Sequence, residues 1–144
     1  MNPGKALGYK LTWMSRARYP PEGLLRNFSQ FEYCYRDASN YKSWGRLLLQ
    51  GVASAADVED LQRHFDSGEF FIAEQLGIPS LYAELWAFSG GPTIDDHVWH
   101  TFYGLRPAAA STLDAPVFGT VKNFVKMVKA VQAWDATLSP HWDI

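Results

Sequence analysis

The chain has 144 residues, which is the usual size of one domain and is long enough to bury most of the surface of the unfolded chain. Hydrophobic residues make up 47% of the chain and aromatic residues 15%, so the composition excludes a disordered protein and predicts a compact core. The net charge of −2 does not favour nucleic acid as a partner.

The first 26 residues show no steady hydrophobic period. They include "RYPPEGLL", where Pro20 and Pro21 exclude a regular helix or a central strand. We therefore expect a loosely ordered leader over 1–26 and one globular domain over 27–144.

A β-hairpin is predicted next. In "FEYCYR" the residues Phe31, Tyr33 and Tyr35 alternate with more polar ones, which is the period-two pattern of a half-buried strand at 30–36. The side chains of "DASN" close turns by bonding to nearby backbone, and "YKSWGRLLLQG" then predicts a returning strand at 41–51.

Two helices and a short strand are predicted in the middle of the chain. Ser54 and Asp57 have the spacing of an N-terminal cap, and apolar residues recur after them at helical intervals, so we expect a helix at 55–66. The run "EFFIAEQLGIPSLYAELWAF" at 69–88 can begin as a short buried strand before the break at Gly77–Pro79, and a second helix is expected at 79–88.

The last third adds a strand and a helix. "HVWHTFYGL" is rich in β-branched and aromatic residues, which predicts a strand at 97–105. Thr120 stands as a cap before "VKNFVKMVKAVQAW", whose apolar and lysine residues fall on different faces, so we expect a closing helix at 121–134. The predicted class is α+β, with a small, mostly antiparallel sheet packed with two or three helices.

Three stretches carry a resemblance to known proteins. "YRDASNYKSWG" at 35–45, "FFIAEQLGIPSLY" at 70–82 and "GGPTIDDHVWHTF" at 90–102 resemble stretches of small, uncharacterised bacterial and phage-type proteins. The resemblance implies a bacterial or phage origin. It implies no activity, catalytic residue or cofactor.

Charge is divided along the chain. Residues 1–26 carry a net charge of +4, whereas residues 54–100 carry −8. Such an asymmetry can steer a charged partner, or the segments can complement one another or stay solvated. Asp57, Glu59 and Asp60 stand in the first turns of a predicted helix, and we expect them to attract a protein partner with a basic surface. A lysine stripe on the closing helix is the rival surface.

"DDHVWH" at 95–100 gathers two carboxylates and two imidazoles around a tryptophan. On a strand, His97 would share a face with Asp95 and Trp99, and His100 would share the other face with Asp96. The imidazoles would then diverge, so we expect neither a metal nor another cofactor. The interpretations left open are a His–Asp acid/base pair, and two structural histidines beside a core Trp99, each bonded to an Asp or a backbone carbonyl.

The polar side chains at the hairpin end form a plausible lip for a pocket that binds an anion or a partner's backbone. They are Arg36, Asn40, Tyr41 and Lys42. The structural alternative is a self-bonded turn in which Arg36 pairs with Asp37 or Glu32.

Other chemistry has little support in the sequence. Cys34 is the only cysteine, so no intrachain disulfide is possible, and its place between two tyrosines predicts a buried, inert thiol. The glycines lack the spacing of phosphate-binding and dinucleotide-binding loops. No apolar run approaches the roughly 20 residues of a membrane helix, and none resembles a signal peptide, so we expect a cytoplasmic protein.

Two function classes remain. The first is a protein-binding or inhibitory module of a bacterium or phage, of the adaptor, immunity or anti-defence type, that acts through its acidic surface. The alternative is a small hydrolase or nucleotide-processing enzyme centred on Asp95, Asp96, His97 and His100. The first is favoured because the sequence contains no convergent set of nucleophile and base, or of metal ligands.

Overall fold

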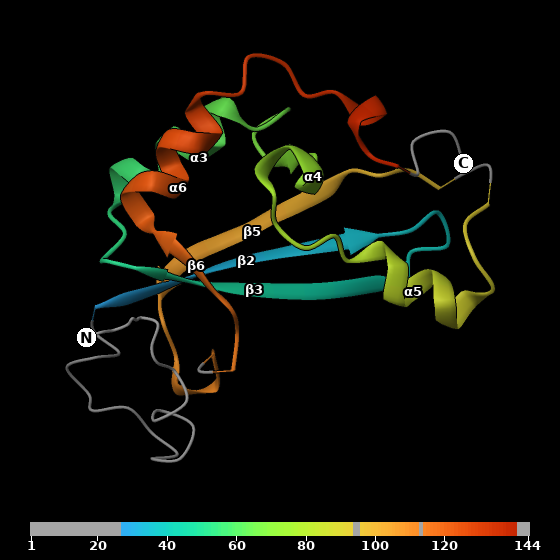
Figure 1. The fold of residues 1–144 in the computed structure, drawn as a ribbon, viewed down its shortest axis with the longest axis horizontal. Coiled ribbons are helices and arrows are strands. Elements are labelled where there is room, and N and C mark those ends of the chain that lie inside the picture. The colour runs from blue at the N-terminus through green and yellow to red at the C-terminus, as the bar shows by residue number, and fades with distance from the viewer. Residues whose placement is uncertain (1–26, 94–95, 113, 141–144) are drawn as a thin grey trace.

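The computed structural model describes residues 27–93, 96–112 and 114–140, so the predicted leader and Asp95 lie outside the described residues. These residues form a five-stranded sheet in the order β4-β5-β2-β3-β6 (Figure 1). The strands are β2 (Phe28–Arg36), β3 (Lys42–Gln50), β4 (Phe70–Phe71), β5 (His100–Pro107) and β6 (Val117–Thr120). The helices are α3 (Ala55–His64), α4 (Ala73–Leu76), α5 (Tyr82–Ser89) and α6 (Val121–Lys129), with short 3-10 turns η1 (Ala110–Thr112) and η2 (Ala136–Leu138).

The sheet is mostly antiparallel. β2 pairs with β3 and β5, and β4 pairs with β5, all in antiparallel orientation, whereas β6 runs parallel to β3. Helices α3, α4 and α6 lie together on one side of the sheet (Figure 1). The predicted α+β class is therefore confirmed.

The core lies between this helical layer and one face of the sheet. Phe31, Tyr33 and Tyr35 of β2 point into it and are each at most 1% exposed, as their alternation predicted. The centroid of the Phe31 ring lies 5.4 Å from that of Phe102 in β5 and 4.7 Å from that of Phe124 in α6. Phe31 therefore joins the central strands to a helix. Burial of large rings contributes much of the stability of such a core.

A second cluster of buried side chains covers the hairpin end of the sheet. It consists of Tyr35, Ile72, Tyr82, Trp86 and Val98. The Tyr82 and Trp86 rings stack with their centroids 4.5 Å apart. Leu81, just before α5, packs against both clusters and so connects them.

Both predicted helix caps are present. Ser54 and Asp57 form a capping box, in which the Ser54 N–H donates to Asp57 Oδ2 at 2.8 Å and the Asp57 N–H donates to Ser54 Oγ at 3.2 Å. The Thr120 hydroxyl accepts from the Asn123 N–H at 3.0 Å at the start of α6. These bonds satisfy backbone donors that a helix cannot satisfy itself. No helix among the described residues is long and apolar enough to cross a lipid bilayer.

The closing helix is shorter than the sequence predicted, because it ends at Lys129 and not at Trp134. Tertiary hydrogen bonds hold the chain beyond it. The Trp134 Nε1–H donates to the His64 carbonyl at 2.8 Å, and the Asp135 N–H donates to Gln75 Oε1 at 2.7 Å. The helical pattern of the sequence therefore continues past the point where these contacts end the helix.

Other boundaries also differ from the prediction. α5 begins at Tyr82 and not at residue 79, and β5 begins at His100 and not at residue 97. The single-turn α4 and the four-residue β6 were not predicted, because elements this short depend on their neighbours for pairing and burial. The short strand expected before the Gly77–Pro79 break is present as the two residues of β4, and α4 follows it within the same stretch.

Replacing Gly45 by alanine should lower the free energy of unfolding by about 1–3 kcal/mol, as overpacking of a core does. An added Cβ would stand 2.8 Å from Leu81 Cδ2 and 3.0 Å from Tyr33 Cε1, and both side chains are held by the core. Urea denaturation measures the change.

Gly104→Ala is the matched control. The nearest atom to its added Cβ, at 3.1 Å, is Nη2 of Arg106, whose long, exposed side chain can move away. We expect this variant to keep the native stability or to gain slightly, since alanine restricts the unfolded chain. Equal losses at both glycines would contradict the close packing of Leu81 against β3.

Candidate binding site

The two histidines of the "DDHVWH" stretch have separate structural roles. His100, the first residue of β5, is fully buried, and its Nε2 accepts a hydrogen bond from the Leu81 N–H at 3.0 Å. His97 precedes the strand and is exposed, and its Nδ1 accepts from the Trp99 N–H at 3.0 Å. Each imidazole thus accepts a hydrogen bond from a backbone N–H, whereas the structural interpretation expected each to bond to an Asp or a backbone carbonyl. No group of three possible metal ligands forms among the described residues.

Both histidines favour the neutral form. Burial lowers the pKa of His100 to about 4, and the Val98 carbonyl near its ring only partly opposes this shift. Partial burial of the His97 ring also lowers the pKa of His97. Hydrogen bonding to the Arg36 backbone and the negative charges of Asp96 and Asp37 oppose this shift. Neither imidazole is therefore cationic at neutral pH.

Trp99 is not the core residue that the structural interpretation expected. It is half-buried at the margin of the second cluster, whereas Val98 and His100 are buried. Residues 97–100 alternate in burial although only His100 belongs to β5, and the buried side is that of Val98 and His100, which leaves Trp99 on the side of the exposed His97. The Tyr35 hydroxyl donates to the His97 carbonyl at 2.8 Å and anchors this irregular segment.

Asp96 joins this segment to the hairpin. Its Oδ1 accepts from the Ala38 N–H at 2.9 Å and its Oδ2 accepts from the Thr93 N–H at 2.8 Å. Burial alone would raise the pKa of Asp96, but these hydrogen bonds outweigh it and lower the pKa. The carboxylate therefore acts as a clamp between two segments that are far apart in the sequence.

The hairpin turn is self-bonded, but through a different residue from the one predicted. Asp37 Oδ1 accepts from the backbone N–H groups of Ser39 and Tyr41, each at 2.9 Å, and Asn40 takes a left-handed φ of 71°. Arg36 makes no ion pair with Glu32, because Glu32 binds Arg106 at 2.8 Å from the neighbouring strand. The predicted lip residues are all exposed: Arg36, Asn40, Tyr41 and Lys42.

Arg36 and His97, which were predicted in separate clusters, line one cavity of about 500 Å³. Asp37, Glu69, Phe70 and Tyr103 also line it. A neighbouring cavity of about 390 Å³ shares Phe70 and His97 with the first and adds Asp66 and Trp99. We refer to the two together as the hairpin pocket.

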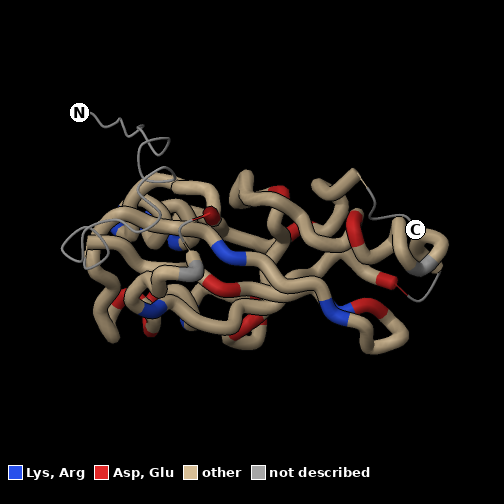
Figure 2. Tube along the Cα trace, turned by 90° about the horizontal axis from the view of Figure 1, so that it is seen from below, with Lys and Arg blue, Asp and Glu red and all other residues tan. Residues whose placement is uncertain are grey.

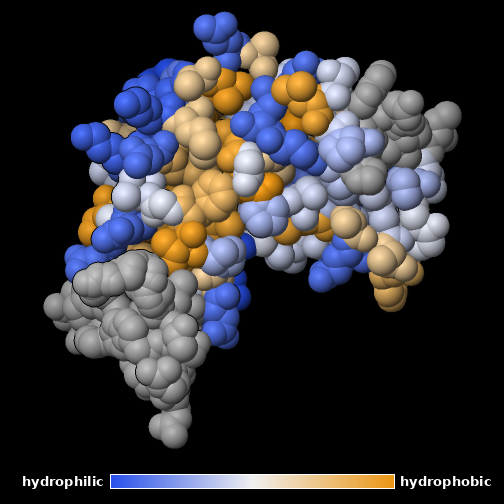
Figure 3. Space-filling model, viewed as in Figure 1, coloured by the Kyte–Doolittle hydropathy of each residue, from blue (hydrophilic) through white to orange (hydrophobic). Residues whose placement is uncertain are grey.

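The acidic residues of α3 were predicted to form the binding surface, and their charges are partly used within the fold. Asp57 belongs to the capping box. Asp60 forms two ion pairs, in which its Oδ1 lies 3.1 Å from Nη1 of Arg63 and its Oδ2 lies 3.7 Å from Nζ of Lys129. Glu59 is exposed. Hydrophilic residues cover the region of α3 and α6, with hydrophobic residues showing between and below them (Figure 3).

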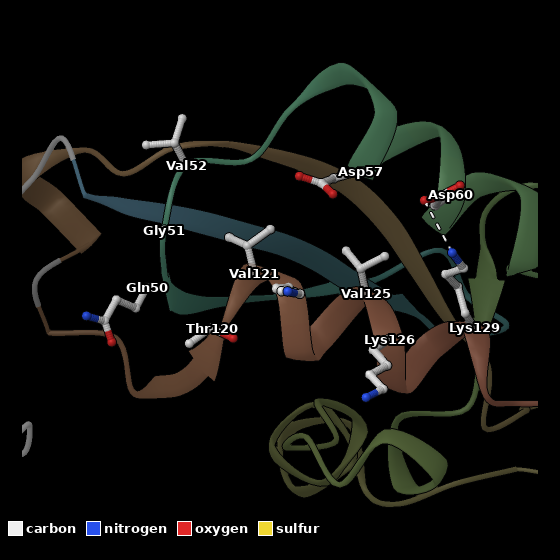
Figure 4. Close-up of a pocket in the computed structure, with 11 residues that line it drawn as sticks. Gln50, Gly51, Val52, Asp57, Asp60, Thr120, Val121, Val125, Lys126 and Lys129 are labelled. Carbon is white, nitrogen blue, oxygen red and sulfur yellow. Dashed lines mark ion pairs between the residues drawn. The ribbon is translucent and has the colours of Figure 1, made fainter.

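The lysine stripe on α6 and the acidic residues of α3 form two walls of one groove. The groove has a volume of about 670 Å³, with Val121 and Val125 between the walls (Figure 4). Asp57 and Asp60 stand on one side, and the Lys126 side chain points away from them. The charges of the two surfaces that the sequence presented as rivals therefore neutralise each other in part, through the ion pair of Lys129 with Asp60.

The sheet face that turns away from the helical layer is a candidate surface that the sequence patterns did not predict. Strand register places Cys34, Trp44 and Thr101 side by side on it. At one end, the η1 segment covers this face, where Thr112 Oγ1 donates to Gln30 Oε1 at 2.6 Å. Toward the hairpin no element of the described residues covers the face, and we call this part the open face. Its exposed side chains are Arg36, Lys42, Trp44, Arg46, Tyr103 and Arg106.

Two aromatic rings lie at the centre of the open face. Trp44 is 55% exposed and Tyr103 is 47% exposed, and their ring centroids are 4.5 Å apart in an edge-on arrangement. Cys34 is buried beside them, as predicted, and burial raises the pKa of its thiol even though Arg36 and Lys42 oppose the shift. A sequence signal existed, because Trp44 occupies the solvent-facing phase of the returning strand, where a large ring is unusual.

Comparison of the chain with protein-family models, with curated proteins and with solved structures finds no significant match. The candidate site therefore depends on the geometry of the described residues alone.

The buried His100 should make the fold sensitive to acid. The His100 imidazole takes up a proton near pH 6.5 in the unfolded chain but only near pH 4 in the folded chain. The contribution of the neutral imidazole to the free energy of unfolding is therefore complete above pH 6.5 and is lost as the pH falls toward 4. The difference is worth at most about 3 kcal/mol. His100→Gln keeps a hydrogen-bond acceptor and cannot be protonated, so its free energy of unfolding should vary less over this range.

Urea denaturation at a series of pH values measures the effect, with His97→Gln as the control. His97 is exposed, so its replacement should leave most of the native acid sensitivity. An unchanged pH slope in His100→Gln would show that the buried imidazole does not resist protonation.

Proposed function

We propose that the chain is a protein-binding module that docks its partner on the open face. The observation that carries this proposal is the contact pair Trp44 and Tyr103, two large rings half exposed at the centre of a sheet face that none of the described elements covers. Tryptophan, tyrosine and arginine are the residue types that dominate binding energy in protein interfaces. The open face combines all three.

The charges of the open face favour an acidic surface on the partner. Its cations are Arg36, Lys42, Arg46 and Arg106, while Glu32 is the acidic residue of the same face and pairs with Arg106. Seen from the side away from the helices, basic and acidic residues are interspersed (Figure 2). A second copy of the chain is a poorer fit, because two open faces would bring like charges together.

A protein fits the open face better than a single-stranded nucleic acid does. Bases stack on aromatic planes that are free on one side, and phosphates require a continuous basic track. Here the Trp44 and Tyr103 rings meet at 78° and partly cover each other. The nearby carboxylates of Asp37 and Glu69 interrupt the basic charge.

The acidic surface of α3 remains the rival docking site within the same function, and it would select a basic partner. The internal use of Asp57 and Asp60 makes it the less favoured of the two. The enzyme alternative is also less favoured, since each imidazole accepts a backbone N–H and no group of three possible metal ligands forms among the described residues. An adaptor, immunity or anti-defence role is compatible with docking on the open face.

Replacing Trp44 and Tyr103 together by alanine should weaken partner binding by at least about tenfold, because central aromatic residues often contribute more than 1 kcal/mol each. The full chain would be used as bait in a lysate of its native host, with mass spectrometry of what it retains. Affinity for the identified partner would then be measured by calorimetry at low and moderate salt. Added salt should weaken binding.

Phe88→Ala is the control, because Phe88 is 81% exposed on α5 and does not belong to the open face. It should bind the partner as the native chain does, and circular dichroism should show all variants folded. Binding that survives loss of both rings would refute the proposal. Binding lost only on replacing Asp57, Glu59 and Asp60 by their amides would assign docking to α3, and capture of nucleic acid alone would also refute it.

A further inference from the structure

The hairpin pocket adjoins the open face through Tyr103, which belongs to both. Its two cavities, of about 500 and 390 Å³, meet at Phe70 and His97. Volumes of this size are in the range of sites for small ligands.

Negative charge predominates in the hairpin pocket. Asp37, Asp66 and Glu69 contribute three carboxylates, and Arg36 contributes the single opposing cation among its described lining residues. Asp37 is buried, and its Oδ1 is already used by the hairpin turn. Neither Asp66 nor Glu69 forms an ion pair with a cation of the described residues, so their charges are uncompensated at the pocket rim.

The fold holds this rim in place. The Phe102 N–H donates to the Glu69 carbonyl at 2.7 Å, and Asp66 exchanges backbone hydrogen bonds with Phe70 at 2.8 Å. Both carboxylates therefore project from backbone tied to the sheet edge. Their positions do not depend on a free loop.

Aromatic residues supply the remaining walls. Phe70 and Tyr103 line the larger cavity, and Trp99 lines the smaller one. Aromatic faces attract cations, and the attraction strengthens where a carboxylate also lies near. The His97 imidazole between the cavities is neutral at pH 7, so it does not oppose a cation.

We infer that the hairpin pocket binds an organic cation, namely the side chain of a lysine or arginine that the partner inserts beside the open face. The inference rests on the proposed docking there, although the cation site itself can be tested without a partner. The inference predicts that the partner's docking surface carries both signs of charge. Its carboxylates would lie opposite the basic residues of the open face, and one cationic side chain would lie at the hairpin end of that face.

The test titrates the full chain with N-acetyl-lysine methylamide and follows amide shifts by NMR. We expect shifts centred on Phe70, His97 and Tyr103. N-acetyl-norleucine methylamide, which lacks the charge, should bind more weakly by about fivefold or more, the effect of removing a cation from an aromatic and carboxylate site. Asp66→Asn combined with Glu69→Gln should weaken binding of the lysine probe to a similar degree.

Two control variants isolate the pocket. Glu59→Gln removes an exposed carboxylate from α3, outside the lining of the hairpin pocket, and should leave probe binding unchanged. Phe88→Ala should also leave it unchanged, since Phe88 lies on α5 and does not line either cavity. Probe binding with no partner docking on the open face would therefore refute the proposed function and retain the cation site.

The cation site is refuted by three results. The first is the absence of shifts at these residues up to the solubility limit of the lysine probe. The second is equal binding of the lysine and norleucine probes, which would indicate a merely apolar pocket. The third is preferential binding of N-acetyl-glutamate methylamide, which would assign the pocket to an anion held by Arg36.

Discussion

The alternation of side chains along β2 is the constraint on which the rest of the described structure depends. Phe31, Tyr33 and Tyr35 must leave water together, and a strand can bury all three only on one face. Pairing of β2 with β3 on one side and β5 on the other completes that face, and the helices then cover it. The opposite face is left with the intervening positions, which include Cys34 and Arg36.

The open face follows from this asymmetry. A sheet with helices on one side only presents its other side to solvent, and antiparallel sheets tolerate this arrangement because polar residues can occupy the exposed phase. Here Trp44 and Tyr103 occupy part of that phase, although no element among the described residues covers them. Large exposed aromatic rings lower the solubility of a protein, and a role in binding would explain why they are present on this face.

The hairpin end shows how polar contacts join distant segments into a site. Asp96 binds the backbone of Ala38, and the Tyr35 hydroxyl binds the His97 carbonyl, so the hairpin and the segment before β5 are held together. The same contacts engage the polar groups that the sequence had marked as chemical candidates. What they leave available is the cavity between the segments, with the uncompensated carboxylates of Asp66 and Glu69 on its rim.

The sequence by itself determined the elements that depend on local pattern: the strand of alternating aromatic residues, the returning strand and the capped helix after Ser54. Periodicity and capping act over a few residues, so a single sequence reveals them. Tertiary structure decided the end of α6 at Lys129, the late start of β5 and the neutralisation of Asp60 by Lys129. It also decided which sheet face stays open and that Arg36 and His97 line the same cavity. Both features are set by contacts between segments far apart in the chain.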